Sequence, residues 1–250
     1  MFGVALFATT LSSCDKDLFG LGGDEESSEL KKIKKITEVE SSGNRTHSFF
    51  WNGDKIVKIV SEDESDDKNN FTYLFFYNGT KIDHCNRTQG TRTMTFKYSY
   101  DGDMIKEITG YYENEYVTKS IISYDSKGRI IKVASTDGYD IKSYNYIWEG
   151  DNVVTVEYYS GDEKVRSLSY QYDSGKNPLN NYMSSFGIDF GILKGDCFSK
   201  NNIKKQTQIE NNGDTEVLNI EYLYDGDGYP VHRNLTYSYG YQRSIRYEYE

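Results

Sequence analysis

The sequence has little proline, cysteine or tryptophan, and it lacks long apolar runs. Among 250 residues there are 2 Pro, 3 Cys and 2 Trp. No apolar run reaches the 18 residues of a membrane-spanning helix, and the mean hydropathy is −0.74. Basic side chains are also in the minority, with 29 Lys and Arg against 39 Asp and Glu. Because phosphate binding needs clustered Lys and Arg, this acidic balance argues against a nucleic-acid groove.

Aromatic residues, in contrast, are abundant and are mostly of one kind. They make up 15% of the chain and include 24 Tyr and 12 Phe. A chain this aromatic can bury enough apolar surface to fold, so disorder is excluded. The length suits one large domain or two small ones.

The N-terminus reads as an export signal. Residues Phe2 to Leu11 form a short apolar run that suits the core of a secretory signal peptide. The run ends in Leu11-Ser12-Ser13-Cys14, which resembles the bacterial lipobox, although no Lys or Arg precedes it. We therefore expect a signal peptide over residues 1–13 and lipidation of Cys14, against the alternative of a buried apolar strand with an ordinary cysteine.

The composition then changes to Gly, Ser and charged residues. This stretch predicts a flexible, lipid-anchored tether over residues 14–35. Residues Glu29 to Glu40 could form a short helix or a first strand. A single repeat-built domain is expected over residues 36–250.

The body of the chain repeats a short pattern about every 25 residues. An aromatic anchor is followed by a polar turn and then by aliphatic residues. After Tyr172 the interval doubles, and Phe198 stands at its midpoint as a degenerate copy. The anchors are Trp51, Tyr77, Tyr100, Tyr124, Trp148, Tyr172, Phe198 and Tyr224.

Each unit predicts a β-hairpin. Asn-Gly and Asp-Gly supply the positive φ angles of tight hairpin turns, and apolar residues alternate with polar ones before each anchor. We expect an all-β fold: an antiparallel meander of about eight hairpins, or roughly 16 strands, with Gln242 to Glu250 as the last strand. The sheet is either rolled into a barrel-like form or left open and strongly twisted. The charged residues on the strands favour a soluble domain over a membrane barrel.

The Tyr-Asp-x-x-Gly unit resembles the YD repeat of Rhs-type bacterial shells. Together with the lipobox, the tether and the Phe198-Ser-Lys-Asn-Asn-Ile segment, residues 36–250 are similar to uncharacterised lipoproteins of gut Bacteroidota. That resemblance implies a domain-of-unknown-function family with a porin-like β fold and an address in the cell envelope. It carries no established activity, so it transfers no catalytic residue.

Few residues are candidates for chemistry. The acidic segment Ser61 to Asn70 reads as a solvated loop, with calcium binding as the alternative, and Asp225-Gly-Asp-Gly reads as turn chemistry. The insertion Asn177 to Asp196 either packs against the sheet or forms a lid over a ligand. The three histidines, His47, His84 and His232, have no metal-ligand spacing, and we expect each to be exposed or hydrogen-bonded.

Cys85 and Cys197 remain after lipidation of Cys14, and an exported protein permits a disulfide between them without implying one. Two carboxylates at the right separation would suffice for a glycosidase, but the sequence places no such pair.

These observations lead to a functional expectation. We expect a non-enzymatic binding or structural lipoprotein of the outer membrane, cell surface or periplasm of a Gram-negative bacterium. Its partners would be the membrane, through the lipid anchor, and a glycan or protein, with no cofactor and no metal, and the protein would be a monomer. The alternatives are a glycan hydrolase with paired carboxylates in a concavity of the sheet and a shell-like scaffold that encloses a partner.

Overall fold

The described part of the protein is a closed antiparallel β-barrel. In a computed structural model, residues 31–180 and 198–250 are described, and these ranges contain sixteen strands and one short 3₁₀ helix, η1 (Asp67–Asn69). No helix in these ranges is long and apolar enough to cross a membrane. The strands are β1 (Ile33–Glu40), β2 (Gly43–Asn52), β3 (Lys55–Asp63), β4 (Phe71–Asn78), β5 (Lys81–Gln89), β6 (Arg92–Asp101), β7 (Met104–Tyr112), β8 (Glu115–Tyr124), β9 (Ile130–Thr136), β10 (Ile141–Glu149), β11 (Asn152–Ser160), β12 (Glu163–Lys176), β13 (Asn201–Glu210), β14 (Thr215–Tyr224), β15 (Pro230–Tyr237) and β16 (Gln242–Tyr249).

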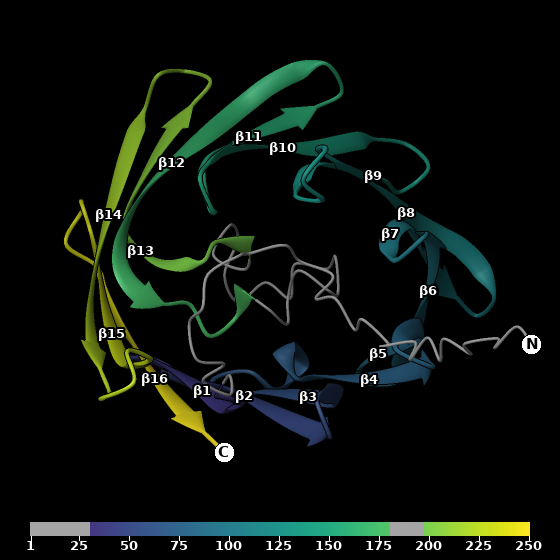
Figure 1. The fold of residues 1–250 in the computed structure, drawn as a ribbon, viewed down its shortest axis with the longest axis horizontal. Coiled ribbons are helices and arrows are strands. Elements are labelled where there is room, and N and C mark those ends of the chain that lie inside the picture. The colour runs from purple at the N-terminus through teal and green to yellow at the C-terminus, as the bar shows by residue number, and fades with distance from the viewer. Residues whose placement is uncertain (1–30, 181–197) are drawn as a thin grey trace, which may run out of the picture. The chain divides into compact units, whose positions relative to one another are not determined.

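The barrel closes where the first strand meets the last. Each strand pairs with its neighbour in sequence, and β1 pairs with β16, so that purple β1 lies beside yellow β16 in Figure 1. The expected all-β meander is confirmed, and of the two expected forms the closed barrel is the observed one. Closure leaves no edge strand in the sheet.

The two ends of the barrel differ in what they carry. At one end, the terminal rim, lie Lys31, Glu250 and the turns that follow the even-numbered strands β2 to β14. At the other end, the loop rim, lie the turns that follow the odd-numbered strands, including the acidic loop between β3 and β4. We use these two names below.

The buried apolar side chains face the inside of the barrel. On β14, Leu218 and Ile220 are buried while Asn219 and Glu221 between and after them are exposed, and β16 alternates in the same way. Since the outer face of a closed sheet is the one open to solvent, the buried set must point inward. The outer face also carries exposed apolar side chains, among them Phe50, Leu74 and Ile121.

The buried residues lie mainly in the half of the barrel near the terminal rim. Ile36 and Ile59 are fully buried there, with Ile82, Val153 and Ile245 in the same core cluster. Wide barrels of 16 strands can enclose an open channel. Here the inward side chains of this half are covered, so it forms a core.

Eight hydrogen bonds tie the strands together at the terminal rim, and we call them aromatic latches. In each, a Tyr hydroxyl or Trp indole on an even strand donates to the carbonyl at the start of the preceding odd strand. A turn connects the two strands of each such pair only at the loop rim. The latch therefore holds their other ends together at the terminal rim. The latches within the described residues are Trp51 to Ile33, Tyr77 to Ile56, Tyr100 to Ile82, Tyr124 to Ile105, Trp148 to Ile130, Tyr172 to Val153, Tyr222 to Ile203 and Tyr249 to Pro230.

The turns at the terminal rim have the positive φ angles that their glycines predict. Gly53 and Gly102 have φ angles of 56° and 57°, which L side chains rarely adopt. The strand register shifts directly before Trp51 and before Tyr100, and such a bulge re-aims the side chain that follows it.

One expected repeat is absent as an independent unit. Tyr172 pairs with Ile203 across the β12–β13 hairpin, and Phe198 lies in the connection between these two strands. The interpretation of Phe198 as the anchor of its own hairpin was therefore wrong. The eighth strand pair of this kind is formed by β16 and β1, which no turn connects, and Tyr249 stands at its anchor position. Sequence spacing could not reveal a unit whose halves lie at opposite ends of the chain.

The described residues on either side of residues 181–197 pack in the barrel core. Leu179 is 2% exposed, and the ring of Phe198 meets Tyr146 edge-on with centroids 5.3 Å apart. The Ser199 hydroxyl accepts from the backbone N–H of Val153 at 3.1 Å. Of the expected insertion, Asn177 to Asp196, only residues 177–180 are described, and Leu179 among them packs in the core, as Phe198 and Ser199 do just beyond it.

Candidate functional site

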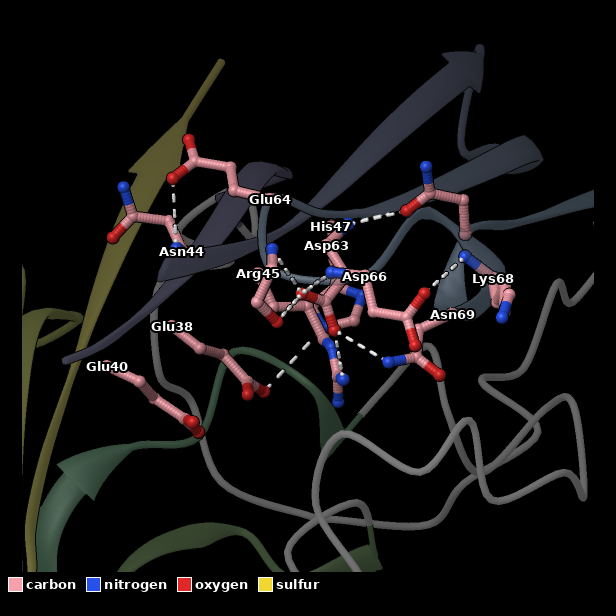
Figure 2. A network of polar contacts seen from close by, with 12 residues as sticks. Glu38, Glu40, Asn44, Arg45, His47, Asp63, Glu64, Asp66, Lys68 and Asn69 are labelled. Carbon is pink, nitrogen blue, oxygen red and sulfur yellow. Dashed lines mark hydrogen bonds and ion pairs between the residues drawn. The ribbon is translucent and has the colours of Figure 1, made fainter. Parts of the chain in front are cut away.

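Polar and charged side chains occupy the interior near the loop rim, beyond the apolar core. The set comes from β1, β2, β3, β15 and β16, which are neighbours around the closure of the barrel. Figure 2 shows three of its members, Glu38, His47 and Asp63. The buried polar residues here are Glu38, His47, Ser61, Asp63 and Arg233.

Glu38 is the centre of this polar set. Its carboxylate accepts from Arg243 at 2.6 Å and lies 3.6 Å from Nε2 of His47. Arg243 also reaches Glu40 at 3.4 Å, so one guanidinium serves two carboxylates of β1. Burial by itself raises the pKa of Glu38, but His47 and Arg243 outweigh it, and the pKa lies below its usual value.

This lowered pKa bears on the hydrolase alternative. A glycosidase acid must hold its proton near neutral pH, which requires a raised pKa. Glu38 is the most deeply buried carboxylate of the site, and its pKa is shifted in the opposite direction. Glu38 is therefore unsuited to be the general acid of such a pair.

Glu38, His47 and Ser61 also form a row across three adjacent strands. Ser61 is the cross-strand partner of His47, and the order acid, imidazole and hydroxyl is that of a nucleophilic triad. Within the described part of the chain, however, neither the Ser61 hydroxyl nor either His47 ring nitrogen has a hydrogen-bond partner. The nucleophile–base bond that would activate the serine is therefore not formed.

His47 is buried beside a carboxylate. It is 2% exposed, and its Nε2 lies 3.6 Å from a carboxylate oxygen of Glu38, an ion-pair contact slightly longer than a hydrogen bond. His84 lies on the outer face, stacked on Phe76 with ring centroids 4.4 Å apart. Its neighbour Cys85 is fully buried on the opposite face, as the strand geometry predicts.

The acidic loop is organised around one carboxylate. Asp63 accepts from the Ser65 hydroxyl at 2.5 Å, from Asn69 at 3.1 Å and from Arg45 at 2.5 Å. These donors hold the pKa of Asp63 well below its usual value. Figure 2 shows Asp63 with Arg45 and Asn69 beside it.

The loop's carboxylates do not converge on a metal. In residues 31–180 and 198–250, no three His, Cys, Asp or Glu side chains are grouped as a metal site requires. Asp225 at the other rim accepts from the backbone N–H groups of Asp227 and Tyr229 at 3.0 and 2.9 Å, which is turn chemistry.

The turn between β15 and β16 gathers three tyrosines at the loop rim. The ring centroids of Tyr237 and Tyr239 are 5.3 Å apart, those of Tyr237 and Tyr241 are 5.5 Å apart, and those of Tyr239 and Tyr241 are 6.3 Å apart. We call them the tyrosine cluster. Sequence reasoning missed it, although a signal was present: the run Tyr-Ser-Tyr-Gly-Tyr lies in a turn, away from the anchor positions.

The remaining sequence candidates have separate outcomes. Cys14, the expected lipidation site, lies outside the described residues, and so does Cys197. Cys85 is a free thiol. A hollow of about 540 Å³ on β6 and β7 is lined by polar side chains and two tyrosines and is remote in sequence from the polar set.

Comparison with known proteins shows a fold relationship. No family model matches the chain, and no curated protein matches it. A porin-like protein from Bacteroides uniformis superposes with a TM-score of 0.62 at 13% identity, covering 87% of this chain and 96% of the other. A porin-like protein from Bacteroides vulgatus has a TM-score of 0.45 at 15% identity, covering 88% of this chain and 99% of the other. This chain therefore has the fold of the porin-like protein from Bacteroides uniformis.

Proposed function

We propose that this protein is a lipid-anchored binding module of the cell envelope that receives its ligand at the loop rim. The observation that carries the proposal is the division of the barrel interior. The half near the terminal rim is an apolar core held by latches, whereas the loop-rim end buries charged and polar side chains, and among them the Ser61 hydroxyl has no hydrogen-bond partner in the described residues. A buried, unpartnered polar group costs about 1–3 kcal/mol. Proteins retain such groups mainly where function uses them.

The attachment point supports the same orientation. Lys31 lies at the terminal rim, where its ammonium meets Asp225 at 2.7 Å and Asp227 at 2.5 Å. If Cys14 carries the lipid, the connecting chain joins the barrel at this rim and spans at most about 60 Å. The loop rim is then the end farther from the attachment point, and it carries the tyrosine cluster.

The anchor is tested by fractionating cells that express the full chain. The Cys14→Ala variant should move from the membrane fraction to the soluble fraction, because it lacks the thiol that accepts the lipid. Ser12→Ala keeps a small residue in the lipobox and should leave the protein in the membrane fraction. Membrane retention of Cys14→Ala would disprove the anchor.

Binding is tested with the purified full chain on a glycan array and on a peptide array. Saturable binding on either array supports a binding module. If the protein binds on neither array while circular dichroism shows that it is folded, the structural shell is favoured instead. Turnover of arrayed glycans into shorter products would favour the hydrolase.

A further inference from the structure

The tyrosine cluster is held in place by the backbone of its own turn. Tyr237 N–H donates to the Tyr241 carbonyl at 2.9 Å, and Gly240 N–H donates to the Tyr237 carbonyl at 2.9 Å. Ser238 N–H donates to the Val217 carbonyl at 2.8 Å, which ties the turn to β14. Gly240 has a φ of 90°, so the turn depends on a residue without a side chain. The rings are therefore preorganised rather than carried on a loose loop.

The cluster exposes ring surface that packing alone does not require. Tyr239 is 68% exposed and Tyr241 is 39% exposed, while Tyr237 packs against the barrel core. The rings of Tyr239 and Tyr241 are inclined by only 16° to each other. Tyr237 thus supports two neighbouring rings that remain accessible at the mouth of the barrel.

Polar groups suited to hydroxyl recognition surround these rings. Partial burial and then the charge of Glu40 raise the pKa of the Tyr241 hydroxyl, which remains a neutral donor. Glu40 also lies 3.4 Å from Arg243. Partial burial and the charge of Glu216 raise the pKa of the Tyr239 hydroxyl in the same way. The cluster therefore combines flat apolar faces with acceptors and donors at their edge.

This combination matches the chemistry of one ligand class. A pyranose has a flat face of C–H groups that packs on an aromatic ring, and hydroxyls around its edge that need both donors and acceptors. Tyrosine supplies an apolar body with a polar tip, a carboxylate accepts from hydroxyls, and a guanidinium donates to them. Peptide recognition instead reads side chains in pockets or adds a strand to a free sheet edge, and this barrel is closed.

We propose that Tyr237, Tyr239 and Tyr241, with Glu40 and Arg243, form a carbohydrate-binding site for a pyranose-containing glycan. A sugar ring stacks on Tyr239, and its hydroxyls reach Glu40 and Arg243. The site rests on the proposed function, because it supplies the ligand class for binding at the loop rim.

The test is affinity electrophoresis of the full chain in gels that contain soluble polysaccharides, namely a β-glucan, a xylan, a galactomannan or mucin. Wild-type protein should be retarded by at least one of them. Tyr239→Ala should weaken that binding about tenfold, because it removes the stacking ring. Tyr239→Phe keeps the ring and should bind within about threefold of wild type.

A matched control comes from the same rim. Tyr139, in the β9–β10 turn, is 96% exposed, and Tyr139→Ala should migrate as wild type in every gel. Glu40→Gln should weaken binding less than Tyr239→Ala does, because an amide oxygen still accepts from hydroxyls.

The outcomes separate this site from the proposed function. Retardation that Tyr239→Ala leaves unchanged overturns the site but keeps a glycan-binding module. Wild-type protein that no polysaccharide retards overturns the carbohydrate assignment, and saturable binding on the peptide array would then still support a binding module. Equal losses in Tyr139→Ala and Tyr239→Ala would also overturn the site, since they show no specific role for the cluster.

Discussion

The hydroxyl of Tyr249 donates a hydrogen bond to the carbonyl of Pro230 over 2.7 Å, and this bond closes a series of eight. Each latch satisfies a carbonyl at the beginning of an odd strand, using a donor at the tip of a large ring. A phenylalanine would fill the same space without the donor. The latches therefore give a physical reason for six of the 24 Tyr and for both Trp in the sequence.

Removing one latch hydroxyl should destabilise the barrel without disturbing its packing. In Tyr100→Phe the Ile82 carbonyl loses its donor, which lies 2.9 Å away in the native protein. We expect the free energy of unfolding to fall by about 1 kcal/mol, measured by urea denaturation. Tyr116→Phe, at a residue 48% exposed on β8, should change it by less than about 0.5 kcal/mol. Identical urea midpoints for the two variants would count against the latch.

The close approach of Tyr224 to β12 should make one glycine irreplaceable. A Cβ added at Gly175 would lie 2.4 Å from the ring of Tyr224. The hydroxyl of that tyrosine donates a hydrogen bond to the carboxylate of Asp173. Gly175→Ala should therefore cost about 1–3 kcal/mol through forced repacking. At Gly226, an added Cβ meets nothing within 4 Å, so Gly226→Ala serves as the control. Thermal unfolding of both variants checks this, and equal midpoints would contradict it.

Substitution of two buried serines by alanine should change the stability of the protein in opposite directions. Ser199 is fully buried, and its hydroxyl contacts Val153 and Tyr172, so Ser199→Ala should lower stability. Ser61 is 1% exposed and its hydroxyl has no partner in the described residues, so Ser61→Ala should leave stability unchanged or raise it by about 1 kcal/mol. The midpoints of denaturant-induced unfolding show whether each variant is less or more stable than wild type. A loss in Ser61→Ala as large as that in Ser199→Ala would show that the Ser61 hydroxyl is satisfied in solution.

The acidic loop should make stability depend on pH through Asp63. Its hydrogen bonds to Ser65, Arg45 and Asn69 hold its pKa in the folded protein below the unfolded value of about 4. The stabilisation is therefore complete above pH 4 and is lost as pH falls through the folded-state pKa. Asp63→Asn should lower the melting temperature at pH 7, and the difference from wild type should narrow at about pH 3.

The neighbouring carboxylate gives the control for this experiment. Glu62 is exposed on the opposite face of β3, and Glu62→Gln should shift the melting temperature little at either pH. If the difference in melting temperature between wild type and Asp63→Asn stays constant from pH 7 to pH 3, the assigned role of Asp63 is contradicted.

Much of the fold was predictable because its information is local. Asn-Gly and Asp-Gly at residues 52–53 and 101–102 require particular turn geometries, and alternation along β14 requires one buried face. Phe198 misled the repeat count because it has an anchor's ring and spacing, yet the pairing of Tyr172 with Ile203 makes it part of a connection. The candidate site was less predictable. His47 and Glu38 are ordinary residues in the sequence and acquire significance only when β1, β2 and β16 lie side by side.

The sequence by itself determined the antiparallel hairpins and the face that each strand buries, because turn chemistry and period-two alternation act between residues close in the chain. Only the tertiary structure decided that β16 closes on β1, since that pairing joins segments about 200 residues apart. Closure in turn places Arg243 against Glu38 at 2.6 Å and the tyrosine cluster beside Glu40. Contacts of this kind depend on long-range register, which no local pattern encodes.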